Sequence, residues 1–324
     1  MKQNRKRFYL IEAALASFIL ILGIQIFFEK KADDHSKITV ILPDSENHSW
    51  SAFRYGLKMA AQDTGTELLI VSTGKTLTAE EELKLISQEL EQDTQAVIIQ
   101  PVPGTDLAEN LKKLEKKIPI MLVKDTLPQD PASTPFPVTE PDHEAMGKAL
   151  AEQLLEDYNH NLSGKTIGIL LESENRPALE SRKKGFQETL KGTGAVFSWT
   201  ASLSSEETKE NSLKNRKKAD LVIALDNNSL TAAAECAAAN DLHGALVYGI
   251  GNSTEAIYFL DNRIVECLIV PDEFSMGYQS MKEIAEHAGK RFRKMKSVKV
   301  TYYVFRRETL YSEKNQEILF TMSQ

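Results

Sequence analysis

Short polar segments follow several apolar runs of this chain, and their side chains can hydrogen-bond a small molecule. The first, residues 44–50, follows the apolar run 38–42 and ends in one of only two tryptophans. Similar segments occupy 124–126, 226–229 and 251–253. Amides, carboxylates and hydroxyls pair with ligand hydroxyls, and an aromatic face suits the apolar side of a sugar ring. These residue types therefore favour binding of a polyhydroxylated molecule.

Four of the candidate binding residues have structural alternatives. Trp50 opens a segment with helical spacing, so the alternative to ligand contact is packing in the core. Asp226 and Asn227 precede the segment 229–242, and the alternative for them is capping of that helix. The alternative for Arg182 is a solvated charge in the run 181–184, although its place three residues before Gly185 and Phe186 at a helix start favours a role in the cleft. The sequence leaves these alternatives open.

Motifs for phosphate and dinucleotide binding are incomplete. The segments STGKT (72–76) and SGKT (163–166) lack the first glycine of a phosphate loop, and GIGNST (249–254) lacks the third glycine of a dinucleotide loop. The six histidines show no metal-ligand spacing, and 142–144 is interpreted as a solvated helix start. We therefore expect no metal, no cofactor and no enzymatic activity.

Charge and cysteine content exclude further classes. The net charge of −7 argues against nucleic-acid binding, which requires a basic surface. Cys236 and Cys267 lie in different segments without Cys-x-x-Cys spacing, so buried thiols are favoured over a zinc site or redox pair.

The elements that must position these residues alternate between strands and helices. Helical periodicity appears in 50–64, 79–93, 142–157, 178–192 and 229–242. This order predicts an α/β fold, with parallel sheets covered by helices on both faces. The predicted strands are 38–42, 67–71, 96–100, 118–123, 166–171, 195–200, 221–225, 245–250 and 265–270.

A proline-rich segment interrupts the alternation and divides the chain into two lobes. Residues 127–142 carry five of the eleven prolines, and Asp142 is a predicted N-cap of the helix that follows. Residues 299–305 read as a final strand or hinge segment. We expect two doubly wound lobes, the first formed by 37–140 and 271–292, the second by 141–270, and a C-terminal segment, 293–324.

The N-terminus predicts a membrane segment. A basic tail, 1–7, precedes the apolar stretch 8–28, which as a helix would extend about 30 Å and span a bilayer. Cleavage after Ala32 would require a small residue where Lys30 stands, so an uncleaved anchor is favoured over a signal peptide. We expect a single-pass protein of the cell membrane with its C-terminal domain outside the cytoplasm.

Six segments in order resemble the type I periplasmic binding proteins of the ribose and galactose branch. The resemblance covers about residues 37–291 and implies two doubly wound lobes joined by three crossings, closing on a sugar held between them. The segments are ITVILPDSENHSW (38–50), IPIMLVKDT (118–126), ESRKKGF (180–186), ADLVIALDNNSLTAA (219–233), LVYGIGNS (246–253) and VECLIVPDEFSMGYQSM (265–281).

The resemblance also implies ligand contacts at individual positions. The family's Asp-Arg pair after the fourth strand is matched by Lys124 and Asp125, with the charges reversed, and its asparagine after the VIAL strand by Asp226. Gly251, beside Asn252, replaces an aspartate, and Ile269 or Val270 replaces a glutamine. The predicted ligand-binding residues are Asn47, Ser49, Trp50, Lys124, Asp125, Arg182, Asp226, Asn227 and Asn252.

The function implied by the resemblance is binding without chemistry. A solute-binding protein of this kind presents a sugar-like ligand to an ABC permease or reports its occupancy to a membrane histidine kinase. The alternative from a different class is a ligand-free extracytoplasmic interaction module that uses the same fold.

Overall fold

The computed structural model describes residues 36–44, 48–73, 78–102, 105–127, 135–174, 176–203, 213–288 and 294–324. Within these ranges no helix is long and apolar enough to cross a membrane. The predicted tail 1–7 and membrane segment 8–28 lie outside the described residues.

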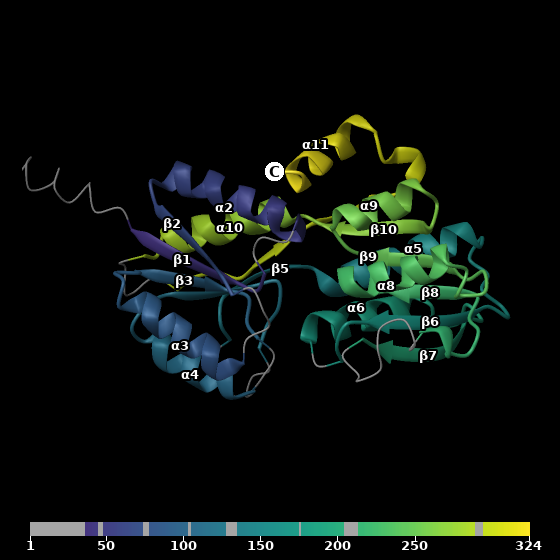
Figure 1. The fold of residues 1–324 in the computed structure, drawn as a ribbon, viewed down its shortest axis with the longest axis horizontal. Helices are drawn as coiled ribbons and strands as arrows, with labels where there is room; N and C mark the ends of the chain where they lie inside the picture. The colour runs from purple at the N-terminus through teal and green to yellow at the C-terminus, as the bar shows by residue number, and fades with distance from the viewer. Residues whose placement is uncertain are drawn as a thin grey trace, which may run out of the picture.

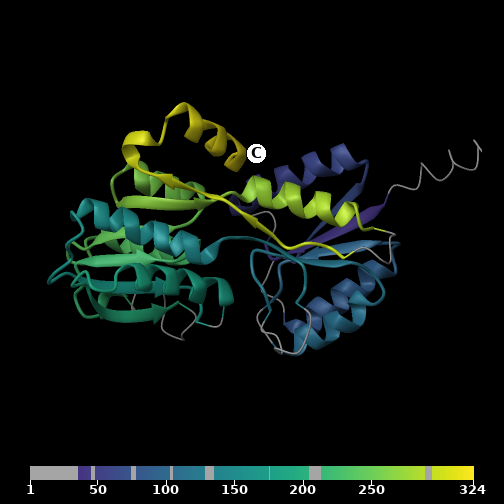
Figure 2. The same cartoon turned by 180° about the vertical axis from the view of Figure 1, so that it is seen from behind.

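Two six-stranded sheets form two lobes side by side, as Figures 1 and 2 show. All strands of the first sheet are parallel. Its order is β11 (Val298–Val300), β5 (Val138–Pro141), β4 (Ile120–Val123), β3 (Ala96–Ile99), β1 (Lys37–Leu42) and β2 (Glu67–Ser72).

The second sheet repeats this architecture, except that its edge strand β12 is antiparallel to β10. Its order is β12 (Tyr302–Phe305), β10 (Val265–Pro271), β9 (Leu246–Ile250), β8 (Leu221–Ala224), β6 (Thr166–Leu171) and β7 (Val196–Ser202). The α/β class with two parallel-sheet lobes is therefore confirmed, and each of the nine predicted strands overlaps an observed one.

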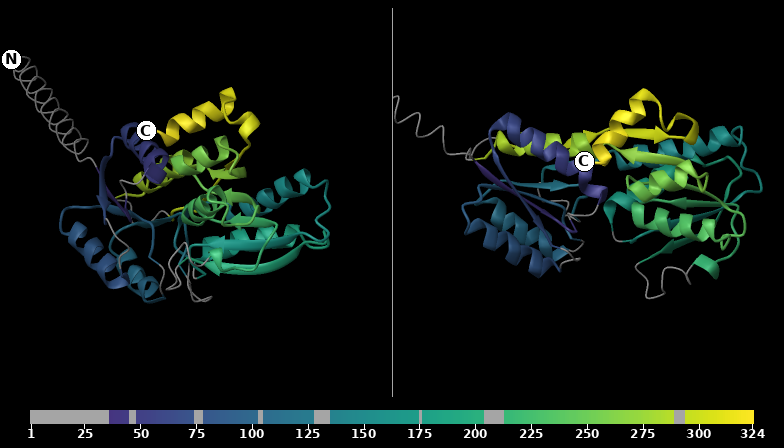
Figure 3. Two further views of the ribbon diagram at one scale, coloured as in Figure 1. Left: turned by 45° about the vertical axis from the view of Figure 1, so that its right-hand side comes forward. Right: turned by 45° about the horizontal axis from the view of Figure 1, so that its top comes forward.

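Helices cover both faces of each sheet, as the views in Figure 3 also show. In the first lobe α2 (Ser51–Thr64) and α10 (Glu273–Ala285) pack on one face, and α3 (Ala79–Leu90) and α4 (Thr105–Glu115) on the other. In the second lobe α5 (His143–Asp157) and α6 (Pro177–Thr189) oppose α8 (Asn227–Ala238) and α9 (Thr254–Asp261). The central strands are consequently buried on both faces, as their continuous apolar runs predict.

The chain crosses between the lobes at three places. Pro141 ends β5 before α5 begins in the second lobe, and Pro271 ends β10 before α10 begins in the first. The third crossing lies at Thr301, between β11 and β12. The amide of Asp272 donates to the carbonyl of Thr301 (3.0 Å), so two of the crossings are hydrogen-bonded to each other.

Two segments differ from the sequence prediction. β5 lies inside the proline-rich segment interpreted as a connection only; its four residues pair with β4 and β11 although they contain no long apolar run. The C-terminal segment contains η2 (Arg307–Thr309) and a further helix, α11 (Glu313–Met322). This helix contacts α2 and η1 (His48–Trp50), and its Met322 packs in the same cluster as Ala52, so α11 bridges the lobes (Figure 1).

Glycines bring one pair of helices together in each lobe. A Cβ on Gly147 of α5 would overlap the backbone oxygen of Arg182, and one on Gly185 of α6 would overlap that of Glu144. Gly56 and Gly277 play the same part between α2 and α10. Because the backbones touch, the N-terminal turns of these helices are held in fixed positions beside the interlobe space.

Candidate functional site

A cavity of about 310 Å³ lies between the two lobes. It is lined by segments that follow β1 and β4 in the first lobe and β8 and β9 in the second, where the carboxyl ends of parallel strands face each other. Asn47 lies outside the described residues. The other predicted site residues all line this cavity: Ser49, Trp50, Lys124, Asp125, Arg182, Asp226, Asn227 and Asn252.

The backbone of Lys124 adopts a left-handed conformation, with φ of 66°. Its amide donates to the carbonyl of Thr139 (3.1 Å), and its carbonyl accepts from Nε2 of His143 (2.8 Å). A non-glycine residue in this region is uncommon, and here hydrogen bonds on both sides hold it. The resulting turn directs the side chains of Lys124 and Asp125 toward the cavity.

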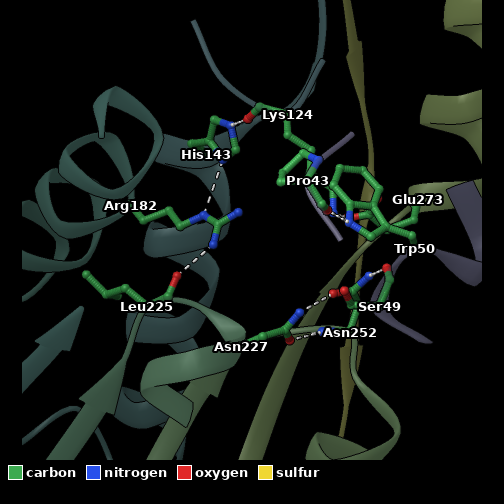
Figure 4. A network of polar contacts seen from close by, with 10 residues as sticks. All are labelled: Pro43, Ser49, Trp50, Lys124, His143, Arg182, Leu225, Asn227, Asn252 and Glu273. Carbon is green, nitrogen blue, oxygen red and sulfur yellow. Dashed lines mark hydrogen bonds and ion pairs between the residues drawn. The ribbon is translucent and has the colours of Figure 1, made fainter. Parts of the chain in front are cut away.

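The ammonium of Lys124 covers the aromatic ring of Trp50, as Figure 4 shows. Its Nζ lies 3.5 Å from the ring centroid and 3.2 Å from Oε1 of Glu273. Burial lowers the pKa of Lys124, and the Glu273 carboxylate opposes that shift. The lysine is thus held by an ion pair and a cation–π contact together.

Trp50 packs in the core of the first lobe and also lines the cavity. It is 4% exposed, packs edge-on against Phe53 at 5.3 Å and belongs to the core of the first lobe. Its Nε1 donates to the carbonyl of Pro43 (3.1 Å), and the residue also lines the cavity. The indole is therefore a core residue with an ammonium on its face, and not the open stacking platform that its position in the sequence suggests.

Asp125 connects the two lobes. Its Oδ1 accepts from the amide of Thr126 (2.9 Å) and from that of Ala178 (3.1 Å), in the first turn of α6 in the second lobe. Burial raises the pKa of Asp125, while these two amide donors act in the opposite direction. The helix N-terminus favours the ionised carboxylate.

Arg182 and His143 form a chain of hydrogen bonds across the site (Figure 4). Nε of Arg182 donates to Nδ1 of His143 (3.2 Å), and Nη1 donates to the carbonyl of Leu225 (2.6 Å). Because Nδ1 accepts, Nε2 carries the proton that is donated to Lys124. Burial, followed by the charge of Arg182, lowers the pKa of His143 to about 3. The imidazole is neutral, and its 3.6 Å contact with Oε2 of Glu140 is not an ion pair.

This finding corrects the interpretation of 142–144 as a solvated helix start. Asp142 does cap α5, accepting from the amide of Ala145 (3.2 Å) as predicted. His143, however, is only 6% exposed. The helix starts at the interlobe boundary and not at the surface, which is why its first residue is buried.

Asp226 caps a helix, as the structural alternative proposed. Its Oδ1 accepts from the amide of Ser229 (2.9 Å), while Oδ2 accepts from the Ser229 hydroxyl (2.7 Å) and the amide of Glu172 (2.8 Å). The carboxylate lines the cavity, but these three donors from the protein already engage both of its oxygens.

Asn227 and Asn252 bind each other and connect the lobes. Asn227 Nδ2 donates to Asn252 Oδ1, and Asn227 Oδ1 accepts from the amide of Asn252, both at 2.7 Å. The remaining amide group of Asn252 donates to the carbonyl of Ser49 in the first lobe (2.8 Å). In this structure a direct hydrogen bond therefore joins the two lobes across the cavity.

Sequence reasoning missed His143 and Glu273, which line the cavity. Each is the first residue of a helix that begins directly after a Pro-Asp pair, 141–142 or 271–272, and in each pair the aspartate caps the helix. The repeated Pro-Asp at the end of a strand was the signal that could have identified both. Gln100, Glu172 and Arg176 were also missed, and together with Asp44 and Asn228 they complete the charged and amide lining.

Among the described residues no group of three or more His, Cys, Asp or Glu side chains is placed to hold a metal ion. Cys236 and Cys267 are both buried, and no disulfide joins them. Polar groups from both lobes instead converge on one space, which suits a small molecule that both lobes enclose.

Comparison with known proteins places this geometry in a family. Residues 38–291 match the model of the periplasmic binding protein domain. A search of curated proteins found no match.

Solved structures with the same fold have low sequence identity. A carbohydrate transporter solute-binding protein from Agrobacterium radiobacter, in complex with D-arabinose, is 18% identical with a TM-score of 0.75, over 88% of this chain and 99% of that one. GanP, a glucose-galactose binding protein from Geobacillus stearothermophilus, is 17% identical with a TM-score of 0.73, over 86% and 100%. The XylFII-LytSN complex contains a chain that is 16% identical with a TM-score of 0.69, over 85% and 98%.

Proposed function

The chain belongs to the periplasmic binding protein family, and we propose that it is an extracytoplasmic solute-binding protein whose lobes close on a sugar or sugar derivative. The observation that carries this proposal is the cavity of about 310 Å³ between the lobes, to which both contribute polar side chains. Membership of the ribose and galactose branch is part of the proposal.

Closure would act by population shift. A ligand that contacts both lobes binds the closed form better than the open one, so it moves the equilibrium by the difference between the two affinities. The three crossings near Asp142, Asp272 and Thr301 are the places where the backbone can rotate. A partner can then distinguish closed from open without any reaction in the cavity.

We further propose that residues 8–28 anchor the protein in the cell membrane, with the lobes outside the cytoplasm. The apolar length and the basic tail of the sequence support this. An anchored receptor suits either an ABC permease or a sensor histidine kinase. One structurally similar protein is a carbohydrate transporter solute-binding protein in complex with D-arabinose, and another, XylFII, forms a complex with LytSN. Proteins of this fold therefore occur both bound to a sugar and bound to another protein.

The second candidate is an interaction module that binds no small molecule. It is favoured by the observation that Asn227, Asn252 and Asp226 are hydrogen-bonded within the protein and that Lys124 covers Trp50.

Thermal unfolding of the purified full chain in mild detergent separates the two candidates. We expect a pentose, hexose or inositol at millimolar concentration to raise Tm by mass action, because it binds the folded state alone. Arg182→Ala should abolish the shift, whereas Lys184→Ala, an exposed lysine on the same helix, should preserve it. Absence of a shift with every compound would favour the interaction module.

A further inference from the structure

Arg182 is held in the cavity by uncharged partners. Its two hydrogen bonds go to the neutral imidazole of His143 and to the backbone carbonyl of Leu225. A guanidinium has five N–H donors, so three are left. Figure 4 shows the remaining terminal nitrogen of Arg182 pointing into the space between the side chains drawn.

The other two cations of the described cavity lining, Lys124 and Arg176, each have a carboxylate partner. Lys124 pairs with Glu273 (3.2 Å), and Arg176 lies 4.0 Å from Glu172. Among the described residues, no carboxylate lies within ion-pair distance, 4.0 Å, of Arg182.

The three carboxylates that act on the charge of Arg182 are engaged with other groups, Glu273 with Lys124 and the other two with donors of the protein. Asp226 accepts three hydrogen bonds at the start of α8, and Asp125 accepts two backbone N–H donors, one of them at the start of α6. Helix N-termini and backbone donors offset much of their negative charge. These carboxylates act on the Arg182 charge only from beyond ion-pair distance, so among the described residues the guanidinium has no direct counterion.

We propose that the ligand of this cavity is an acidic sugar, with a carboxylate that binds Arg182. The inference rests on the proposed solute-binding function and narrows its substrate class. A partly buried cation without a direct counterion is unfavourable, and a ligand carboxylate would supply that direct counterion through parallel N–H···O bonds. One positive charge without a direct counterion matches one carboxylate better than the nearly double charge of a phosphate.

Matched sugars test the class on the unaltered full chain by isothermal titration calorimetry. The pairs are D-glucuronate with D-glucose and D-galacturonate with D-galactose, and the methyl ester of each uronate keeps its shape but removes its charge. We expect at least one uronate to bind roughly tenfold or more tighter than both its neutral hexose and its ester, because charge-assisted bidentate bonds are the strong ones.

The outcomes separate this inference from the proposed function. If a neutral hexose or an ester binds as tightly as the uronate, the acidic class is wrong and sugar binding stands. If glucose 6-phosphate binds tighter than glucuronate, the carboxylate assignment is wrong. If no sugar binds at all, both the inference and the proposed function fail.

Substitutions test whether Arg182 causes the preference for the uronate over its neutral hexose. Arg182→Gln should reduce the uronate's affinity to that of its neutral hexose, and Arg182→Lys should restore part of the preference. Lys184→Gln removes the same charge from an exposed position on the same helix and should leave the preference unchanged. A preference that survives Arg182→Gln would overturn the assignment, and the ligand pairs on the unaltered chain decide the class even if that variant fails to fold.

Discussion

At the scale of single residues, the ion pair between Lys124 and Glu273 is the contact of the site whose loss should destabilise the protein most, since both side chains are largely removed from water. The side chain of Glu273 is 3% exposed, and its Oε2 is buried without a hydrogen-bond partner in the described structure. Lys124 is therefore the main compensation for that carboxylate. Burial raises the pKa of Glu273 and the lysine opposes the rise. A buried pair of this kind stabilises only while both members are present.

The first prediction concerns that pair. Lys124→Met should lower the free energy of unfolding by roughly 3–5 kcal/mol, because it leaves a buried carboxylate without its cation. Adding Glu273→Gln should recover much of the loss. Urea denaturation of both single variants and the double variant gives the coupling energy. Losses that simply add would mean that the two groups do not interact.

The second prediction concerns His143, whose folded-state pKa is lowered to about 3 from a usual value of 6.5. The folded state thus favours the neutral ring, so its contribution to stability is complete above pH 6.5 and is lost as the pH falls toward 3. As the pH is lowered through this window, His143 should reduce the free energy of unfolding by up to about 1.4 kcal/mol per pH unit.

Comparison with His143→Gln isolates that contribution from other titrating groups. Urea denaturation at pH 7, 5.5 and 4.5 should show a shallower decline for the variant than for the unaltered chain. Parallel declines would show that the imidazole does not titrate differently in the folded and unfolded states.

At the scale of elements, two helix pairs position the site. α5 packs on α6 and α2 packs on α10, each through a glycine on either helix. α5 begins after the cap Asp142, and α10 begins after the cap Asp272. Each of these aspartates lies where the chain crosses between the lobes. The positions of His143, Glu273 and Arg182 therefore depend on how closely these helices approach.

The third prediction tests that approach. Gly147→Ala places a methyl group against the backbone oxygen of Arg182, so α6 must move away from α5. We expect a loss of roughly 1–3 kcal/mol in stability, typical of overpacking, together with weaker ligand binding because Arg182 is displaced. Thermal unfolding and calorimetry measure the two effects. Lys148→Ala, at the exposed neighbouring position, should change neither.

At the scale of the whole molecule, direct hydrogen bonds hold the two lobes together in this structure. They join Asp125 to the amide of Ala178, Asn252 to the carbonyl of Ser49, and His143 to the carbonyl of Lys124. α11 adds a contact on the side of the crossings (Figure 2). A closed form held partly by the protein's own bonds needs less of the ligand's binding energy to become dominant.

The fourth prediction is that removing one such bond favours the open form. Asn252→Ala deletes the contact with Ser49, so the radius of gyration measured by small-angle X-ray scattering should increase. Ligand affinity should fall in proportion to the lost closed fraction. Asn262→Ala removes an amide that bonds within the second lobe and serves as the control. An unchanged scattering curve for Asn252→Ala would show that this bond does not govern closure.

The sequence by itself determined the alternation of strands and helices and the segments that meet between the lobes. Apolar runs of strand length fixed nine strands, and the ends of parallel strands share one edge of a sheet, so residues after those runs had to come together. Asp125, Asn227 and Asn252 could be selected on this ground, whereas Arg182, inside a predicted helix, is selected from the family resemblance. These features depend on local periodicity, which can be recognised within a single segment of the sequence.

Only the tertiary structure decided what these residues contact. β5 is a strand because β4 and β11 pair with it, and Trp50 loses its open face because Lys124, 74 positions away, lies over it. His143 and Glu273 enter the cavity because their helices begin at the crossings between lobes. Burial, ion pairing and the pKa of each group arise from contacts between distant segments, and no local pattern encodes them.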